Sequence, residues 1–421
     1  RMKDGYGINE HLIRYAYEEG VDTILTCDNG IAAVEQTKLA KSLGMTILIT
    51  DHHEVQEEVP PADAVVNPRQ ADCPYPFKHL CGAAVAYKVI CCLYEAYGIP
   101  KEETEEFLEF AGFATVGDVM DLIGENRILV KEGLKRLNHT QNVGMASLIR
   151  ACGLEEKEIK SYHIGFVLGP CINAGGRLDT AKRSLNLLLQ KDRAKADVMA
   201  AELKTLNDER KDMTQTGAEE AIEWIEKEGR SQDKVLVVYL PDCHESLAGI
   251  IAGRIRERYN KPVFVLTDSI DGVKGSGRSI EAYSMFEEMS KCKELYTKYG
   301  GHPMAAGLSL PKENVEKFRT FLNEHTTLTE EDFIPKITID VPMPIGYVTE
   351  HLIEELSVLE PFGKGNTKPV FAARDVTLLG ARILGKNRNV LKLQVQDVNG
   401  CRIEAMLFHH ADDFLGKLEE Q

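Results

Sequence analysis

The sequence predicts an α/β protein in which two α/β domains, joined by a long helix, precede a small β domain. Short apolar runs alternate with helical patterns at 21–50 and again at 234–267. Between them, residues 180–228 read as nearly continuous helix without proline. After about residue 330 the pattern changes to short strands divided by turn residues, which is typical of a small antiparallel barrel, possibly of the OB type.

The first α/β unit places acidic and imidazole groups together. The apolar runs "VDTILT" (21–26) and "MTILIT" (45–50) flank the helical pattern "IAAVEQTKLAKSLG". Two strands joined in this way lie parallel with a right-handed crossover, so the residues that follow them share one edge of the sheet. We therefore expect Asp28 to lie beside the triplet Asp51-His52-His53. The run "DAVVNP" (63–68) predicts a third strand ending at the same edge.

The remaining elements follow in order along the chain. Helical patterns cover about 82–97 and 102–115, and the second one leads into Asp118. The second unit begins at "KVLVVYL", continues through the helix "SLAGIIAGRIRERY" and returns as "PVFVLT". We expect four regions: a first α/β domain over 1–180, a connecting helix over 181–230, a second α/β domain over 231–330, and an OB-like β domain over 331–421.

The composition limits the classes of function. A net charge of -16 argues against binding nucleic acid by overall charge, so a polyanion would have to meet a local basic patch or bound cations. Neither a long uncharged apolar run nor a signal-peptide pattern is present, and we expect a cytoplasmic protein. The ten cysteines are spaced neither as zinc ligands nor as a disulfide framework.

The acidic and imidazole groups are candidate ligands for a divalent cation. Carboxylate oxygen with imidazole nitrogen, and no thiolate, suits Mn²⁺ or Mg²⁺ better than structural zinc. A pair of such ions neutralises charge on a transferring phosphate and supplies bound hydroxide. Taken singly, an acid or histidine at a strand end is more often a turn residue. Two such clusters on one sheet edge favour a site. The candidates are Asp28, Asp51, His52, His53 and Asp118.

Glycine-rich turns elsewhere could bind phosphate. In "GSGRS", Ser276 and Arg278 could donate to phosphate oxygens, although an ordinary hairpin turn explains the motif equally well. In "GGHPMAAG", His302 could contact a ligand, and the small residues after it suit a tightly packed helix start. In "INAGGRLDT", Arg177 would follow two glycines at the start of the long helix, where a salt bridge between domains is the competing explanation.

One further loop combines glycine turns with aromatic and basic residues. The segment "LEPFGKGNTKPVF" (359–371) contains Phe362, Lys364 and Lys368. It could be the entry to a strand, or a surface on which single-stranded nucleic acid stacks. The structural interpretation is narrowly favoured.

The order of these motifs resembles that of one known family, the RecJ single-strand-specific exonucleases of the DHH phosphoesterase superfamily. The segments that carry the resemblance are "TCDNG", "TDHHE", "NP" at 67–68, "ATVGDVMDL", "INAGGRL", "HESLAGIIAGR", "GSGRS", "GGHPMAAG" and "LEPFGKGNTKPVF". They extend over nearly the whole chain. The resemblance implies a 5′-to-3′ exonuclease acting on single-stranded DNA in recombination and repair. It also implies DHH, DHHA1 and OB domains and Mn²⁺ or Mg²⁺ as cofactor.

The resemblance further implies a role for each matching residue. Asp28 would be the bridging metal ligand, and His52 and Asp118 would be ligands of the second metal. His53 would contact the scissile phosphate, while Asp51 would orient its neighbours. These five side chains would form the catalytic centre.

Substrate contacts are implied in the same way. Ser276 and Arg278 would match a pocket for the 5′-phosphate, and Arg177 with the region around His302 would line the path of the DNA. The family's first motif, an Asp-x-Asp, would precede "GYG", yet this sequence begins at Arg1. We therefore expect this chain to be part of a longer enzyme, with an incomplete two-metal site, weak metal binding and slow or no cleavage.

Two other functions remain open. A smaller DHH-DHHA1 phosphodiesterase would degrade short oligoribonucleotides or cyclic dinucleotides, and the OB-like segment argues against it. A non-catalytic relative could hold DNA in a replication complex, and the intact candidate ligands argue against that. Single-strand-binding protein and a helicase are partners implied by the resemblance alone. We expect a monomer that does not associate with membranes.

Overall fold

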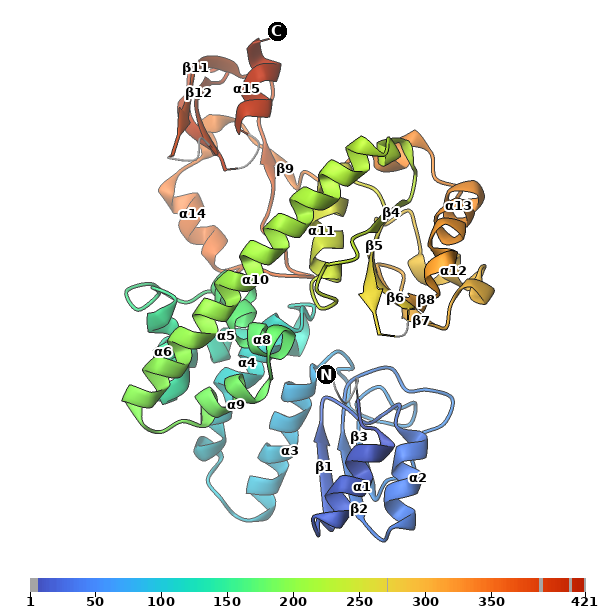
Figure 1. Cartoon of the computed structure of the whole chain (residues 1–421). Coiled ribbons are helices and arrows are strands. Elements are labelled where there is room, and N and C mark those ends of the chain that lie inside the picture. The colour runs from blue at the N-terminus through green and yellow to red at the C-terminus, as the bar shows by residue number, and fades with distance from the viewer. Residues whose placement is uncertain (1–6, 271, 386–388, 409–410, 420–421) are drawn as a thin grey trace.

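The computed structural model describes residues 7–270, 272–385, 389–408 and 411–419. Within them the chain forms an N-terminal sheet domain with a helical extension, a long helix, a second sheet domain and a C-terminal β domain (Figure 1). The predicted fold class is thereby confirmed. None of the helices in this part of the chain combines the length and apolarity that crossing a membrane requires.

The first sheet is parallel, as predicted, and its strand order is β1-β2-β3. The strands are β1 (Thr23–Cys27), β2 (Thr46–Thr50) and β3 (Ala64–Val66), and the helices beside them are α1 (Glu10–Glu18) and α2 (Val34–Ser42). Ile13, Ile47 and Ile49 are buried in a small core between sheet and helices. Cys27 pairs with Thr50, so the residues after both strands emerge side by side.

A set of helices continues this domain. They are α3 (Gly82–Ala96), α4 (Leu108–Gly117), α5 (Gly124–Leu137), α6 (Val143–Ala151), α7 (Ser161–His163), α8 (Gly169–Leu178) and α9 (Lys182–Leu189), with a π-helical turn η2 (Ile164–Leu168). Helix α3 matches its predicted range, whereas 101–107 is 3-10 helix and only α4 is α-helical in the second predicted range. Asp118 follows directly at the C-terminal end of α4.

The long helix α10 (Arg193–Lys227) begins later than predicted. The helix is interrupted between α9 and α10, at residues 190–192. There the Gln190 side chain accepts hydrogen bonds from the backbone amides of Lys191 and Asp192. Asp192 then caps the new helix by accepting from the Lys195 amide. In consequence Arg177 lies near the C-terminal end of α8, and its predicted position at the start of the long helix is wrong.

The second domain contains a five-stranded mixed sheet in the order β4-β5-β6-β8-β7. Its strands are β4 (Leu236–Tyr239), β5 (Val263–Ser269), β6 (Gly272–Arg278), β7 (Lys298–His302) and β8 (Ala305–Leu310), and its helices are α11 (Ala248–Tyr259), α12 (Met285–Ser290) and α13 (Val315–His325). The small residues after His302 were predicted to start a helix. They form strand β8 instead, because they pair with β7 and β6.

The C-terminal domain contains the predicted antiparallel strands β11 (Thr377–Leu384), β12 (Val390–Gln396) and β13 (Arg402–Leu407). A short pair, β9 (Val341–Pro342) and β10 (Phe371–Ala372), and the helices α14 (Glu350–Ser357) and α15 (Ala411–Glu419) accompany them. Residues 336–340 of the predicted strand "KITIDV" are not in a strand. The loop between α14 and β10 returns to the first domain and contacts α5.

Candidate metal centre and phosphate pocket

The predicted clustering of acidic and imidazole groups at the edge of the first sheet is present. Potential ligand atoms of Asp28, His52 and His53 all lie within 4.8 Å of one another. His52 Nε2 lies 3.0 Å from Asp28 Oδ1 and 3.5 Å from Asp118 Oδ2. Asp118 thus joins a cluster whose other members come from two neighbouring strands.

Asp51 holds the cluster in place through hydrogen bonds. Its carboxylate is almost fully buried and accepts hydrogen bonds from the backbone amides of Ile31, at 2.9 Å, and His52, at 2.7 Å. It also lies 2.7 Å from His53 Nδ1. Burial raises the pKa of Asp51, but these hydrogen bonds outweigh burial and hold the pKa below its usual value. The charged carboxylate therefore fixes the turn that presents both histidines.

The two imidazoles differ in their surroundings. His52 is nearly buried and directs Nε2 at two carboxylates, whereas the His53 side chain is half exposed. Burial lowers the pKa of His52, yet Asp28 and Asp118 more than compensate, so the pKa lies above its usual value. With Nδ1 donating to Asp51, His53 would keep Nε2 for a ligand.

Asp28 and Asp118 are open to solvent. About half of each side chain is exposed, which leaves room for a ligand. Burial and the charge of Asp28 raise the pKa of Asp118 above its usual value, against the opposing influence of His52. Two carboxylates so close together favour an added cation.

This donor set fits a hard divalent cation. Carboxylate oxygen and imidazole nitrogen converge from Asp28, His52, His53 and Asp118, and no cysteine is among the clustered ligands in the described residues. His52 is nearly buried and directs its Nε2 into the cluster. Such an arrangement can bind metal and hold an anion beside it.

Two residues near the centre had not been assigned a role in the sequence. A Cβ on Gly82 would lie 2.4 Å from Asp28 Cβ, so only glycine lets the start of α3 approach this ligand. Asn67 is buried and donates from Nδ2 to the His53 carbonyl at 2.9 Å. Its position before Pro68 at a predicted strand end was the available signal.

A separate pocket between α8 and the second domain gathers three of the predicted phosphate contacts. Arg177, Ser276 and Arg278 line a cavity of about 620 Å³, and His302 is not among its lining residues. Arg177 Nη1 donates to the Ser246 carbonyl at 3.1 Å.

Helix α11 has a glycine, Gly249, where the side chains of Arg278 and Ser276 approach it. A Cβ on Gly249 would lie 2.8 Å from both Arg278 Nη2 and Ser276 Oγ. Arg278 Nη1 donates to the Gly277 carbonyl at 2.7 Å. Burial, together with nearby Arg256, lowers the pKa of Arg278. A largely buried guanidinium beside a hydroxyl is suited to an anionic group.

Comparison with known protein families gives three matches along the chain. The DHH family N-terminal domain matches residues 3–117, the DHHA1 domain matches residues 232–327, and the RecJ OB domain matches residues 339–421. Together they account for the three units of the fold in the same order.

Individual relatives agree with these matches. The single-stranded-DNA-specific exonuclease RecJ of Bacillus subtilis is 39% identical over 94% of this chain and 50% of its own length. That of Escherichia coli is 33% identical over 95% of this chain and 72% of its own length. The crystal structure of RecJ from Thermus thermophilus in complex with Mn²⁺ superposes with a TM-score of 0.83 at 30% identity, covering 94% of this chain and 58% of that one. The chain thus spans about half the length of some relatives that it matches.

Proposed function

Because this chain belongs to the RecJ family of single-stranded-DNA-specific exonucleases, we propose that it hydrolyses phosphodiester bonds of single-stranded DNA from the 5′ end. The observation that carries this proposal is the convergence of Asp28, His52 and His53 with Asp118 at one sheet edge. DNA repair and recombination are the processes in which we expect this activity to serve.

Each member of the centre has a proposed task. Asp28, His52 and Asp118 would hold Mn²⁺ or Mg²⁺, the cations in solved RecJ structures. When bound, such ions neutralise the phosphate and lower the pKa of water. His53 would donate from Nε2 to the scissile phosphate. Asp51 would hold the His53 ring in the required tautomer, because it accepts at Nδ1.

The second domain would bind the end of the strand. Arg278 and Ser276 would donate to a 5′-phosphate, and Arg177 at the wall of the same pocket would contact the backbone. His302 is exposed at the end of β7 and outside this pocket, so we propose at most a peripheral contact with the strand for it. A terminal phosphate held here would fix the position of the first phosphodiester bond from the 5′ end.

A cleavage assay tests the proposed function. With Mn²⁺, a 5′-phosphorylated single strand should release mononucleotides, a blunt duplex should resist, and His53→Ala should abolish cleavage while sparing most strand binding. A strong preference for dinucleotides over long strands would favour the smaller phosphodiesterase. Strand binding by the unaltered chain without cleavage under any divalent metal would favour the non-catalytic relative.

We propose a cytoplasmic monomer that meets DNA already opened by a helicase and coated by single-strand-binding protein. The OB domain matched at residues 339–421 supports a single-stranded substrate. Size-exclusion chromatography with light scattering would test the oligomeric state, and a dimer mass would contradict the proposal.

A further inference from the structure

Two of the ten cysteines meet in the helical part of the first domain, where the proposed roles above use neither of them. Cys152 Sγ lies 3.7 Å from Cys171 Sγ, and both are free thiols. Cys152 follows the last residue of α6, and Cys171 lies in the first turn of α8. A disulfide requires sulfur atoms about 2.05 Å apart. A further approach of about 1.7 Å would therefore join the two helices.

The two thiols differ in their access to solvent. Cys171 is 0% exposed and belongs to the apolar core of this helical region, whereas Cys152 packs against that core and is partly exposed. A buried cysteine often serves only as a small apolar side chain, and this is the competing explanation for Cys171. The open position of Cys152 adds what such a filler does not need. A small oxidant can reach one sulfur while the core holds the other beside it.

The surroundings of the pair favour a thiolate, which is the reactive form of cysteine. The hydrogen bond from Cys152 lowers the pKa of Cys171 against the opposing effect of burial, and Lys211 and Lys204 of α10 lower it further. The same hydrogen bond, together with burial, raises the pKa of Cys152. In so closely coupled a pair, the first proton that is lost belongs to the pair rather than to one sulfur. The negative charge can therefore lie on Cys152, the sulfur that solvent reaches.

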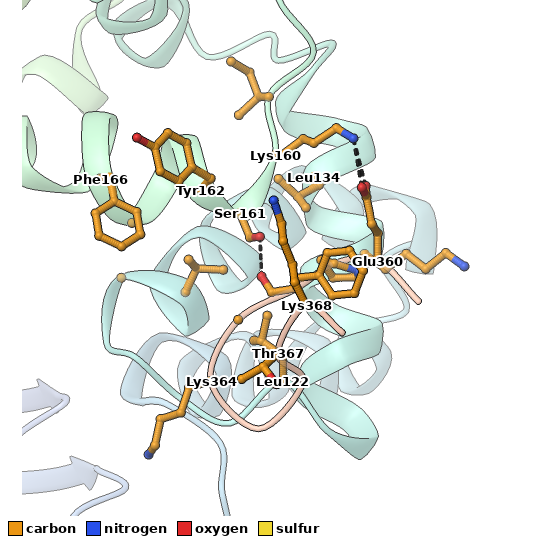
Figure 2. Close-up of a pocket in the computed structure, with 18 of the residues that line it drawn as sticks. Leu122, Leu134, Lys160, Ser161, Tyr162, Phe166, Glu360, Lys364, Thr367 and Lys368 are labelled. Atoms are coloured by element: carbon orange, nitrogen blue, oxygen red, sulfur yellow. Dashed lines mark hydrogen bonds and ion pairs between the residues drawn. The ribbon is translucent and has the colours of Figure 1, made fainter. Parts of the chain in front are cut away.

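Helix α8 connects parts of the molecule that are distant in sequence. The turns that lead into it line a cavity of about 840 Å³ together with residues 357–368 (Figure 2). There the Ser161 hydroxyl donates to the Phe362 carbonyl at 2.5 Å (Figure 2). At the other end of α8, Arg177 lines the phosphate pocket and donates to the Ser246 carbonyl. A covalent bond from α8 to α6 would therefore fix a helix that contacts both other domains.

We propose that Cys152 and Cys171 form a reversible oxidation site, at which hydrogen peroxide joins α6 to α8 through a disulfide. The Cys152 thiolate attacks one peroxide oxygen, the O–O bond breaks, and the hydroxide that leaves takes up the first thiol proton as water. The Cys171 thiolate then attacks the sulfur of the resulting sulfenic acid. The S–S bond forms, the S–O bond breaks, and the second hydroxide takes up the second thiol proton. The two thiols thus lose two electrons and two protons, and the peroxide becomes two waters.

Peptide mapping of the unaltered chain tests the site. The reduced, folded chain is treated with hydrogen peroxide in EDTA, its remaining thiols are blocked with N-ethylmaleimide, and it is digested with trypsin. Peptides 151–157 and 161–177 each contain one cysteine of the pair and no other. Mass spectrometry should find them linked, and dithiothreitol should separate them by thiol exchange. Unfolding in urea before the peroxide should reduce this linkage about tenfold or more, because the fold no longer holds the sulfurs together.

Single variants test which sulfur reacts first. In Cys171→Ser the sulfenic acid on Cys152 has no partner thiol, so dimedone should label peptide 151–157, whereas Cys152→Ser should give no label on peptide 161–177. Cys73→Ser, which removes a partly exposed thiol outside the pair, should form the linkage as the unaltered chain does. Peptides 151–157 and 161–177 that stay separate in the folded, peroxide-treated chain would overturn the proposal. A linkage equally frequent in the urea-unfolded chain would also overturn it, because the fold would then not create the site.

Discussion

At the scale of single residues, the candidate metal centre depends on one buried carboxylate. Asp51 is 1% exposed and accepts from Ile31 and His52 while facing His53 Nδ1. No cation is needed to explain its ionised form, because four donors, including the His53 backbone amide, already surround it. The turn that presents the histidines is thus held by hydrogen bonds to a charge, which are stronger than those between neutral groups.

We expect Asp51→Asn to destabilise the chain and the centre together. The amide keeps the shape of the side chain but replaces an accepting oxygen by a donor that faces other donors. The free energy of unfolding should fall by about 2 kcal/mol, and cleavage should fall with it. Denaturant unfolding measures the first effect. Asp72→Asn, at an exposed loop position, is the control, and equal losses in both variants would contradict the role given to Asp51.

A second prediction concerns a buried acid away from the centre. Glu109 on α4 is 5% exposed and accepts from the Thr140 hydroxyl at 3.0 Å. Burial raises the pKa of Glu109 in the folded chain. Folding therefore takes up a proton, and stability falls as the pH rises from about 4.3, the usual unfolded value, through the raised pKa.

Glu109→Gln should accordingly raise the free energy of unfolding at pH 7 by about 1 kcal/mol, because the neutral amide retains an accepting oxygen without the buried charge. The advantage should shrink as the pH falls through the raised pKa of Glu109 toward about 4.3, and it should be lost below that value, where the unaltered side chain is neutral in both states. Thermal unfolding across this pH range measures the difference. Glu103→Gln, at an exposed position, should show no such pH dependence; a matching dependence there would contradict the assignment.

At the scale of elements, Asp118 is positioned by the contact between α4 and α5. The two helices meet at Gly112 and Gly133, and a Cβ on Gly133 would lie 2.9 Å from Gly112 Cα and 2.9 Å from the Leu108 carbonyl oxygen. Both neighbours are backbone atoms, which cannot rotate away. The close approach therefore sets the position of α4 and of the metal-centre residue at its end.

Gly133→Ala should force these helices apart. We expect a loss of about 1 to 3 kcal/mol in unfolding free energy, typical of overpacking, and weaker binding of Mn²⁺ because Asp118 is displaced. Gly253→Ala on α11 is the control, since a Cβ there meets nothing within 4 Å and alanine favours helix. Calorimetric titration measures the affinity for Mn²⁺. An unchanged affinity in Gly133→Ala would show that the contact between α4 and α5 does not position Asp118 for metal binding.

Some of the helices and strands could be predicted from the sequence, and others could not. The strands β1 and β2 and their common edge could be predicted, because short apolar runs around one helical pattern allow few arrangements. The break at 190–192 was missed, since helical spacing continues across it and only Asp192, a typical cap, signalled a new helix. The strand β8 was missed because small residues suit either element, and its pairing partners are distant in sequence.

At the scale of the whole molecule, the candidate site is divided between domains. The edge of the first sheet could be predicted from local pattern. Asp118 was among the candidate ligands, but its approach to that edge depends on how α3 and α4 pack, which local pattern does not give. Likewise, Arg177 meets Ser276 and Arg278 through the packing of α8 against the second domain. His302 stays outside that pocket although its motif looked similar. Contacts between distant segments leave no periodic signal in a sequence.

This division predicts how the chain recognises the end of a strand. If the second domain holds the 5′-phosphate while the first holds the scissile bond, Arg278→Ala should remove the preference for 5′-phosphorylated over 5′-hydroxyl strands. The loss of a guanidinium-phosphate contact should reduce cleavage of the phosphorylated strand about tenfold to a hundredfold. Cleavage of the hydroxyl strand should change little, because it never made that contact. Arg193→Ala on α10 is the control, and parallel losses on both substrates in Arg278→Ala would show that Arg278 acts on the fold rather than on the strand end.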